Sequence, residues 1–118
     1  RGKGGFVMAK VDRYQEFVIQ VIRDHARHQL AYGEMETQTI FDTERHHYQL
    51  VHAGWNNKLR QYGCLIHIDI KDEKIWIQQD GTEIGVANEL VALGVPNSDI
   101  VLAYLSSFAR QHTEFAVA

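Results

Sequence analysis

The clearest alternation of apolar and polar residues lies between residues 63 and 80, which read GCLIHIDIKDEKIWIQQD. A period of two is typical of a β-strand, because successive side chains of a strand point to opposite faces. The polar pair Asp72–Glu73 interrupts this pattern and β-prone residues resume at Ile75, so the segment predicts a β-hairpin. The apolar face expected for the first strand of this hairpin comprises Cys64, Ile66, Ile68 and Ile70.

A spacing of three and four residues between apolar side chains predicts a helix over residues 10–29. Residues 35–41 and 45–54 predict two strands, which precede those expected at 59–70 and 74–79. Four consecutive strands with short polar connections indicate an antiparallel meander, because parallel strands need longer crossovers. The helical face expected to be buried comprises Val11, Tyr14, Phe17, Val18, Val21, Ile22 and His25.

A second helix is predicted over residues 84–93, and Gly94 and Pro96 are typical residues for its end. Residues 100–105 are compatible with either a short strand or the first turns of a helix, since the polar residues before them would cap a helix well. The apolar residues 115–117 are expected to dock onto the body of the domain.

The expected fold is therefore a single α+β domain over residues 10–118. An N-terminal helix and the second helix cover the same face of the four-stranded antiparallel meander, and a C-terminal segment completes the core. We treat residues 1–9, which are rich in glycine and basic side chains, as a flexible leader. Met8 is a candidate start of the natural chain, in which case the residues before it are foreign to it.

Composition and charge narrow the classes of function. The formal net charge is −3, whereas DNA-binding domains usually carry a basic excess that neutralises phosphates. The single cysteine, Cys64, excludes an internal disulfide and a multi-cysteine zinc site, which suits a reducing, cytoplasmic setting. We expect no membrane association, because no apolar run approaches the ~20 residues that span a bilayer.

Seven histidines raise the question of a metal site. His67 and Asp69 share a strand face, and His52 or Asp80 would complete a ligand set for zinc or iron. However, the motif H-x-D is short, and the polar face of a half-solvated sheet commonly carries such residues. The adjacent residues His46 and His47 are expected on opposite faces of their strand. We therefore expect no metal ion and no cofactor.

The sequence contains no recognisable catalytic motif. Glu83 is a candidate acid, but its expected place in the first turn of the second helix is also where a carboxylate stabilises the helix dipole. Gly81–Gly85 lacks the Lys-Ser/Thr ending of a phosphate-binding loop, and Ser106 and Ser107 lack the context of a nucleophile. We expect a protein that is not an enzyme.

Two sets of surface residues are candidates for binding. The first is a basic patch next to aromatic residues, and its alternative is a charged strand edge that prevents unwanted pairing. This possible DNA-contact patch comprises Arg45, His47, Lys58 and Arg60. The second is the meander face opposite the helices, which has too many aromatic residues to be wholly solvated, so that two copies could pack there as a two-fold homodimer. The expected partner or dimer surface comprises Trp55, His67, Asp69, Trp76 and Gln78.

Several of these segments together resemble the XisI-like proteins, known as fdxN element excision controlling factors. The resemblance begins near Val11 and is strongest from Tyr48 to Tyr104 and in the tail HTEFAVA. Its most specific pieces are GCLIHIDI, KIWIQ, DGTE, VANEL, the GVP turn and TEFAVA. One departure is that the family commonly carries prolines after the GVP turn, whereas residues 104–110 here contain none.

The resemblance implies an accessory role in the developmental excision of a DNA element by site-specific recombination in cyanobacteria. It implies a XisH-like partner and a separate recombinase, and it supplies no catalytic residues. Two alternatives remain from the residues themselves: a direct DNA-binding module, or a cryptic metal-dependent hydrolase that uses His67 and Asp69.

Overall fold

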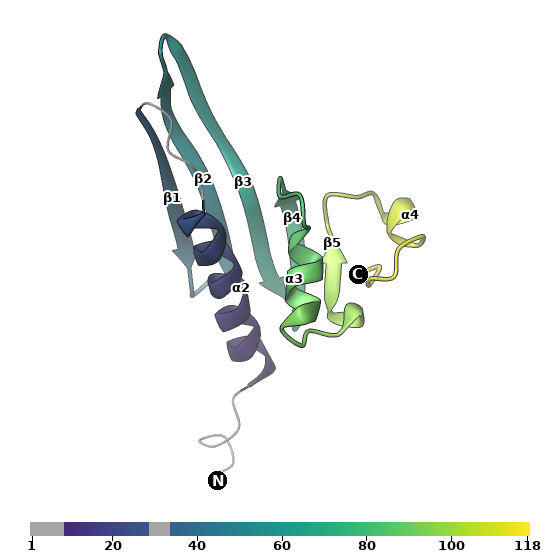
Figure 1. The fold of residues 1–118 in the computed structure, drawn as a ribbon. Coiled ribbons are helices and arrows are strands. Elements are labelled where there is room, and N and C mark those ends of the chain that lie inside the picture. The colour runs from purple at the N-terminus through teal and green to yellow at the C-terminus, as the bar shows by residue number, and fades with distance from the viewer. Residues whose placement is uncertain (1–8, 29–33) are drawn as a thin grey trace.

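In the computed structural model, which describes residues 9–28 and 34–118, helices cover one face of a five-stranded sheet (Figure 1). Most of the leader expected at residues 1–9 lies outside the described residues. The elements in chain order are α2 (Lys10–Arg27), β1 (Glu34–Asp42), β2 (His47–Asn56), β3 (Leu59–Lys71), β4 (Lys74–Asp80), α3 (Val86–Ala92), η1 (Asn97–Asp99), β5 (Ile100–Leu102) and α4 (Ser107–Arg110).

The amphipathic helix α2 is confirmed and begins at the predicted residue, Lys10. Its buried stripe packs against the isoleucines of the sheet, and Val18 and Ile22 are fully buried there. Burial of such side chains contributes about 1.5–3 kcal/mol each to the free energy of folding. The buried residues of the helix are Tyr14, Val18, Val21 and Ile22.

The sheet has the strand order β1-β2-β3-β4-β5, and the first four strands form the predicted antiparallel meander. Asp72 and Glu73 form the β3–β4 turn with positive φ angles of 55° and 60°, the backbone of a two-residue hairpin turn. The expected count of four strands is corrected to five, because residues 100–102 form a short strand, β5, parallel to β4. All three residues of β5 are buried, which is typical of a parallel strand covered on both faces.

Two irregularities in strand pairing change the sheet face on which side chains of β3 and β4 lie. The first is in β3. Leu50 pairs with Ile66 and Val51 with Cys64, so Leu65 has no partner in β2 and forms a bulge. Leu65 packs toward the helix side, and Cys64 turns to the opposite face, where its Sγ lies 3.8 Å from Gln49 Nε2. The expectation that Cys64 shares the apolar face with the isoleucines was therefore wrong.

Helix α3 packs on the same sheet face as α2, as expected, but begins at Val86 rather than at residue 84. Asp80 fixes this start, because its Oδ2 accepts the N–H of Val86, the first helical residue, at 2.8 Å. Glu83 consequently lies in the loop between Asp80 and Val86 and not in the first helical turn. Gly94, with φ of 112°, ends the helix as predicted.

The C-terminal segment returns to the sheet beside β5, as expected of its apolar residues. Ala116 forms a bridge with Val101, and the Ala116 N–H donates to Ile100 O at 2.8 Å. The guanidinium of Arg110 donates to three carbonyl oxygens of this segment, those of Leu105, Val117 and Ala103. The segment without prolines is thus fixed by side-chain hydrogen bonds.

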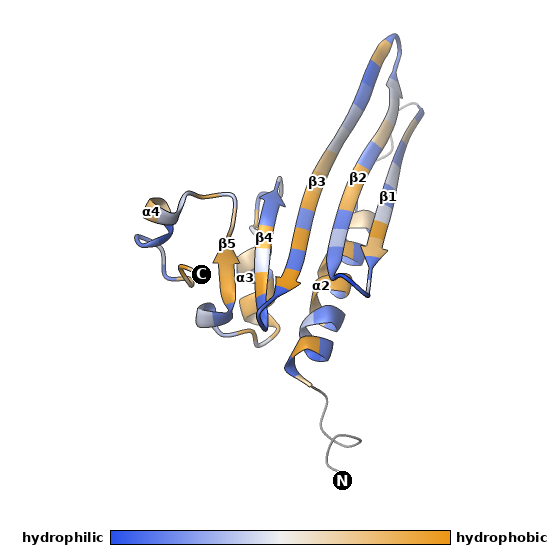
Figure 2. Ribbon diagram, turned by 180° about the vertical axis from the view of Figure 1, so that it is seen from behind, coloured by the Kyte–Doolittle hydropathy of each residue, from blue (hydrophilic) through white to orange (hydrophobic). Residues whose placement is uncertain are grey.

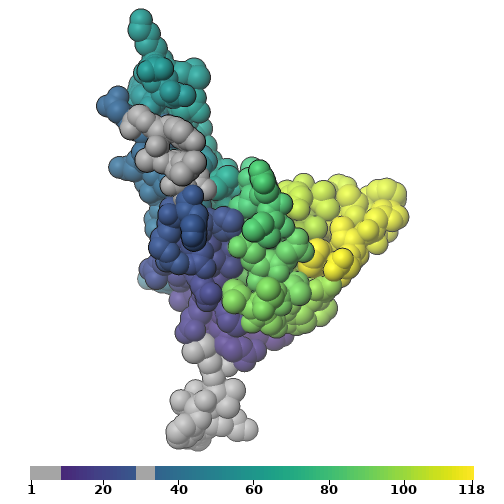
Figure 3. All heavy atoms as spheres, viewed as in Figure 1, coloured from purple at the N-terminus to yellow at the C-terminus, as the bar shows by residue number. Residues whose placement is uncertain are grey.

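The sheet extends well beyond the helical layer. The β2–β3 hairpin projects past α2 and forms an arm, residues 53–62, that gives the molecule its elongated outline (Figures 1 and 3). The principal extents are 57 × 37 × 24 Å. Among the described residues, no helix is both long and apolar enough to cross a membrane.

Candidate functional site

The face of the sheet opposite α2 and α3, here called the open face, carries most of the residues selected from the sequence. Figure 2 views the molecule from behind, and alternating apolar and polar positions are visible along β3. The register places His47, Asp69 and Trp76 side by side in one row across β2, β3 and β4. A second bulge at residues 67–68 then brings Gln78 toward the same row.

Four of these side chains form a hydrogen-bonded group, here called the Asp69 cluster: His47, His67, Asp69 and Gln78. Asp69 Oδ1 lies 2.8 Å from His47 Nδ1 and 2.9 Å from His67 Nε2. Gln78 Nε2 donates to the other carboxylate oxygen, Oδ2, at 3.3 Å. The carboxylate is 20% exposed, whereas the imidazoles of His67 and His47 are 30% and 52% exposed. The cluster is thus open to solvent on its histidine side.

Trp76 lies next to the cluster and connects the hairpin to the C-terminal segment. Its indole N–H donates to Lys71 O at 3.0 Å, and Lys71 Nζ lies 4.0 Å from the ring centroid. The Arg110 guanidinium approaches the same ring at 5.8 Å. Such cation–π contacts stabilise by about 0.5–1 kcal/mol at exposed sites. Trp76 therefore has a structural role in holding the tail.

The predicted partner surface is only partly assembled. His67, Asp69, Trp76 and Gln78 lie together, whereas Trp55 lies in the arm, about 26 Å along β2 from His47 at ~3.3 Å per residue. Trp55 is 45% exposed and its ring is 5.6 Å from the Arg60 guanidinium.

The predicted DNA-contact patch is not assembled as one surface. Arg45 and His47 lie at one end of β2, and Lys58 and Arg60 lie at the other, roughly 30 Å away. The Arg45 guanidinium is paired with Asp42 at 3.6 Å. A hydrogen bond from the backbone N–H of Arg45 also holds the pKa of the Asp42 carboxyl below its ordinary value. At the other end, Arg60 donates to Gly54 O at 3.4 Å.

The structure places neither of the residues considered as a third ligand, His52 and Asp80, beside His67 and Asp69. His52 lies on the helix side, beside His25 and Leu65, and Asp80 caps α3. The residue that the register sets directly opposite Asp69 is His47. The sequence pattern could not join His47 to Asp69, because that contact depends on the register between β2 and β3. His46 lies in the turn before β2 and not on the strand with His47, as had been expected; its Nδ1 is 2.8 Å from the buried Tyr48 hydroxyl, away from the open face.

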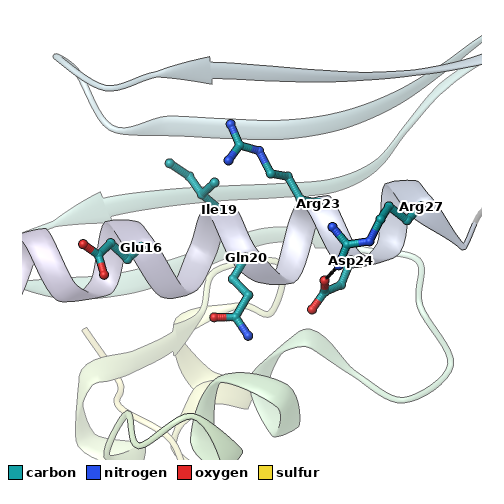
Figure 4. Close-up of a pocket in the computed structure, with 6 residues that line it drawn as sticks. All are labelled: Glu16, Ile19, Gln20, Arg23, Asp24 and Arg27. Carbon is teal, nitrogen blue, oxygen red and sulfur yellow. Dashed lines mark hydrogen bonds and ion pairs between the residues drawn. The ribbon is translucent and has the colours of Figure 1, made fainter.

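Two hollows on the helix side, lined by described residues, are shallow. One of them follows the exposed side of α2, where Ile19 and Arg23 point toward the strands and Gln20 points away (Figure 4). The Arg23 guanidinium lies 5.6 Å from the Phe41 ring. Another hollow borders the His25–Glu89 pair, whose side chains are 2.6 Å apart. Both hollows are wide open to solvent and are bordered by ion-paired side chains, Asp24 with Arg27 and His25 with Glu89, so neither resembles an enclosed substrate site.

Comparison with known proteins supports the resemblance read from the sequence. The model of the XisI protein family matches residues 8–117. A crystal structure of a XisI-like protein from Anabaena variabilis ATCC 29413 is similar with a TM-score of 0.87 and 44% identity, over 93% of this chain and 100% of that one. The crystal structure of fdxN element excision controlling factor XisI from the same strain gives a TM-score of 0.81 and 28% identity, with the same coverage of 93% and 100%.

A comparison with curated proteins found no match. The family model covers nearly the whole chain, and the likeness to both structures extends over the helices and the sheet described above. The chain belongs to the XisI family.

Proposed function

We propose that this protein is a non-enzymatic controlling factor in the excision of a DNA element by site-specific recombination, and that it acts in the cytoplasm through protein contacts. Its partners in this proposal are a XisH-like protein and a second copy of the chain. The excision role rests on the family and on the similar structure of an fdxN element excision controlling factor.

The observation that supports contact as the mode of action is the open face of the sheet. In the part of the chain that the structure describes, α2 and α3 both lie on the other face of the sheet (Figure 1). Ile40, which pairs with Gln49, is 46% exposed, while Val51 on the same face is buried among its neighbours. A sheet face that mixes apolar and polar side chains in this way suits another protein better than a small substrate.

Co-purification with a XisH-like protein tests the proposal. We expect the two proteins to copurify from one expression host at micromolar concentration. Ile40→Arg should abolish the complex, because it places a charge on the open face. Gln20→Arg, on the outer side of α2, is the matched control and should leave the complex intact. Clean separation of the unmodified proteins would contradict the proposal.

The homodimer is tested separately by light scattering. A single chain has a mass of 13.6 kDa, so a dimer should scatter with twice that mass. If the open face is the two-fold interface, Ile40→Arg should halve the measured mass while Gln20→Arg should not. A measured mass of one chain at every protein concentration would contradict the homodimer. It would not bear on the contact with the XisH-like protein, which co-purification tests.

A further inference from the structure

In the Asp69 cluster, nitrogen atoms of two imidazoles lie within hydrogen-bond distance of the same carboxylate oxygen, Asp69 Oδ1. His47 Nδ1 arrives from β2 and His67 Nε2 arrives from β3, the strand that also carries Asp69. Each residue offers one ligand atom, and these atoms lie within 4.8 Å of one another. Among the histidine, cysteine, aspartate and glutamate side chains of the described residues, these three form a group with converging donor atoms.

The chemistry of these atoms fits a transition-metal ion of the zinc class. Two imidazole nitrogens and one carboxylate oxygen are ligands that such ions take, at about 2.0–2.2 Å. Ligand atoms around a tetrahedral ion at those lengths lie about 3.4 Å apart, so the present contacts of 2.8 and 2.9 Å must open by roughly half an ångström. Both histidine side chains are partly exposed and have room for this movement.

The surroundings of Asp69 also match those of a metal ligand. Gln78 donates to the carboxylate oxygen that faces away from the histidines, which orients Oδ1 toward the site. The three residues stand on paired strands, and ladder hydrogen bonds hold His47 opposite Asp69. The exposed side of His47 leaves a further coordination position accessible to solvent.

We infer that His47, His67 and Asp69 form a binding site for one divalent transition-metal ion, of which Zn²⁺ is the best fit. The three protein ligands leave a fourth position for water or for a group from another protein. Gln78 is a positioning residue that acts through Asp69. This inference is independent of the proposed excision role, because it concerns only the chemistry of one side-chain cluster.

Titration calorimetry of the chelator-treated protein with Zn²⁺ tests the inference. We expect one ion per chain at micromolar or tighter affinity, and binding of Co²⁺ at the same site should give visible absorption bands. His47→Gln should weaken Zn²⁺ binding at least tenfold, and it is a safe variant because this side chain is half exposed. Gln78→Ala should weaken it by about tenfold through loss of carboxylate orientation.

His112→Gln is the matched control. His112 is another histidine, which contacts Phe108 far from the cluster in the chain, and its replacement should leave the affinity unchanged. Substoichiometric binding, or equal losses in His47→Gln and His112→Gln, would show adventitious binding and overturn the inference. Circular dichroism of each variant before titration separates loss of the site from loss of the fold.

Discussion

Asp80 sets the boundary between the sheet and α3 through three hydrogen bonds. Its Oδ1 accepts the Thr82 N–H at 2.9 Å and the Thr82 hydroxyl at 2.6 Å, and its Oδ2 accepts the Val86 N–H at 2.8 Å. The Thr82 Oγ1 in turn accepts the Gly85 N–H at 3.1 Å. One carboxylate thus satisfies the Val86 N–H, which the first helical turn leaves free, and also holds Thr82 in the loop before the helix.

Replacing Asp80 with alanine should destabilise the protein by about 2 kcal/mol, the upper range for loss of a cap. The reason is that the Val86 N–H and the 81–85 loop lose their common acceptor. Urea unfolding followed by circular dichroism measures this change. Glu44→Ala, in the exposed β1–β2 turn, is the control and should alter the free energy by less than about 0.5 kcal/mol. Equal effects of both changes would contradict the capping role.

Tyr48 should make stability depend on pH in the alkaline range. Burial, and secondly the Asp42 charge, raise the pKa of Tyr48 from 10.0 to about 12. Between these values the unfolded tyrosine releases its proton while the folded one keeps it, so unfolding becomes easier as pH rises. The stabilising contribution is therefore complete below pH 10 and is lost toward pH 12.

Chemical unfolding at pH 8 and at pH 11 checks this expectation. The free energy of unfolding should be lower at the higher pH, and Tyr48→Phe should reduce that difference. Tyr62→Phe is the matched control, since Tyr62 is 71% exposed in the arm. A difference that is the same in Tyr48→Phe as in the unmodified protein would rule out Tyr48 as the cause.

At the scale of elements, the periods of the sequence predicted α2, the four antiparallel strands and the end of α3. They did so because one face of each element is buried against the other layer, which imposes its period on the sequence. The alternation could not show the bulge at Leu65 or the register that joins His47 to Asp69, since both depend on pairing between strands. The sequence pattern also did not decide between strand and helix for residues 100–105. The reason is that the burial of β5 comes from its neighbours and not from its own pattern.

Arg110 joins α4 and the C-terminal segment to the sheet through its carbonyl contacts and the Trp76 ring. We expect Arg110→Ala to release this segment while leaving the meander folded. Amide hydrogen exchange should then accelerate at Ala116, whose N–H donates to Ile100 O, but not at Ile68. Arg110→Lys should rescue the exchange rate only partly, because an ammonium group cannot reproduce the planar guanidinium contacts. Unchanged exchange at Ala116 would show that other contacts, such as the bridge to Val101 and the hydrogen bond from Lys74 Nζ to Ala118 O, hold the tail without Arg110.

At the scale of the whole molecule, the helices cover only part of the sheet. The radius of gyration is 15.8 Å, whereas a compact chain of 118 residues would have about 13–14 Å. The arm contributes to this extension (Figure 3): Leu59 and Tyr62 are exposed there, while Ile66 and Ile68 in the same strand are fully buried. One strand therefore belongs to two environments, a packed core and a solvated extension.

Backbone protection should fall along β3 from the core toward the arm. Hydrogen-exchange mass spectrometry should show slow exchange in a peptide that contains Ile66–Ile70 and faster exchange in one that contains Leu59–Tyr62, because few buried apolar contacts hold the arm closed. Addition of a binding XisH-like protein should slow exchange in whichever region forms the contact. Slowing in the arm alone would move the proposed contact from the open face around Ile40 to Trp55 and its neighbours. Equal protection of both peptides in the free protein would contradict the uneven stability, since a solvated extension without its own core cannot match the packed part of the sheet.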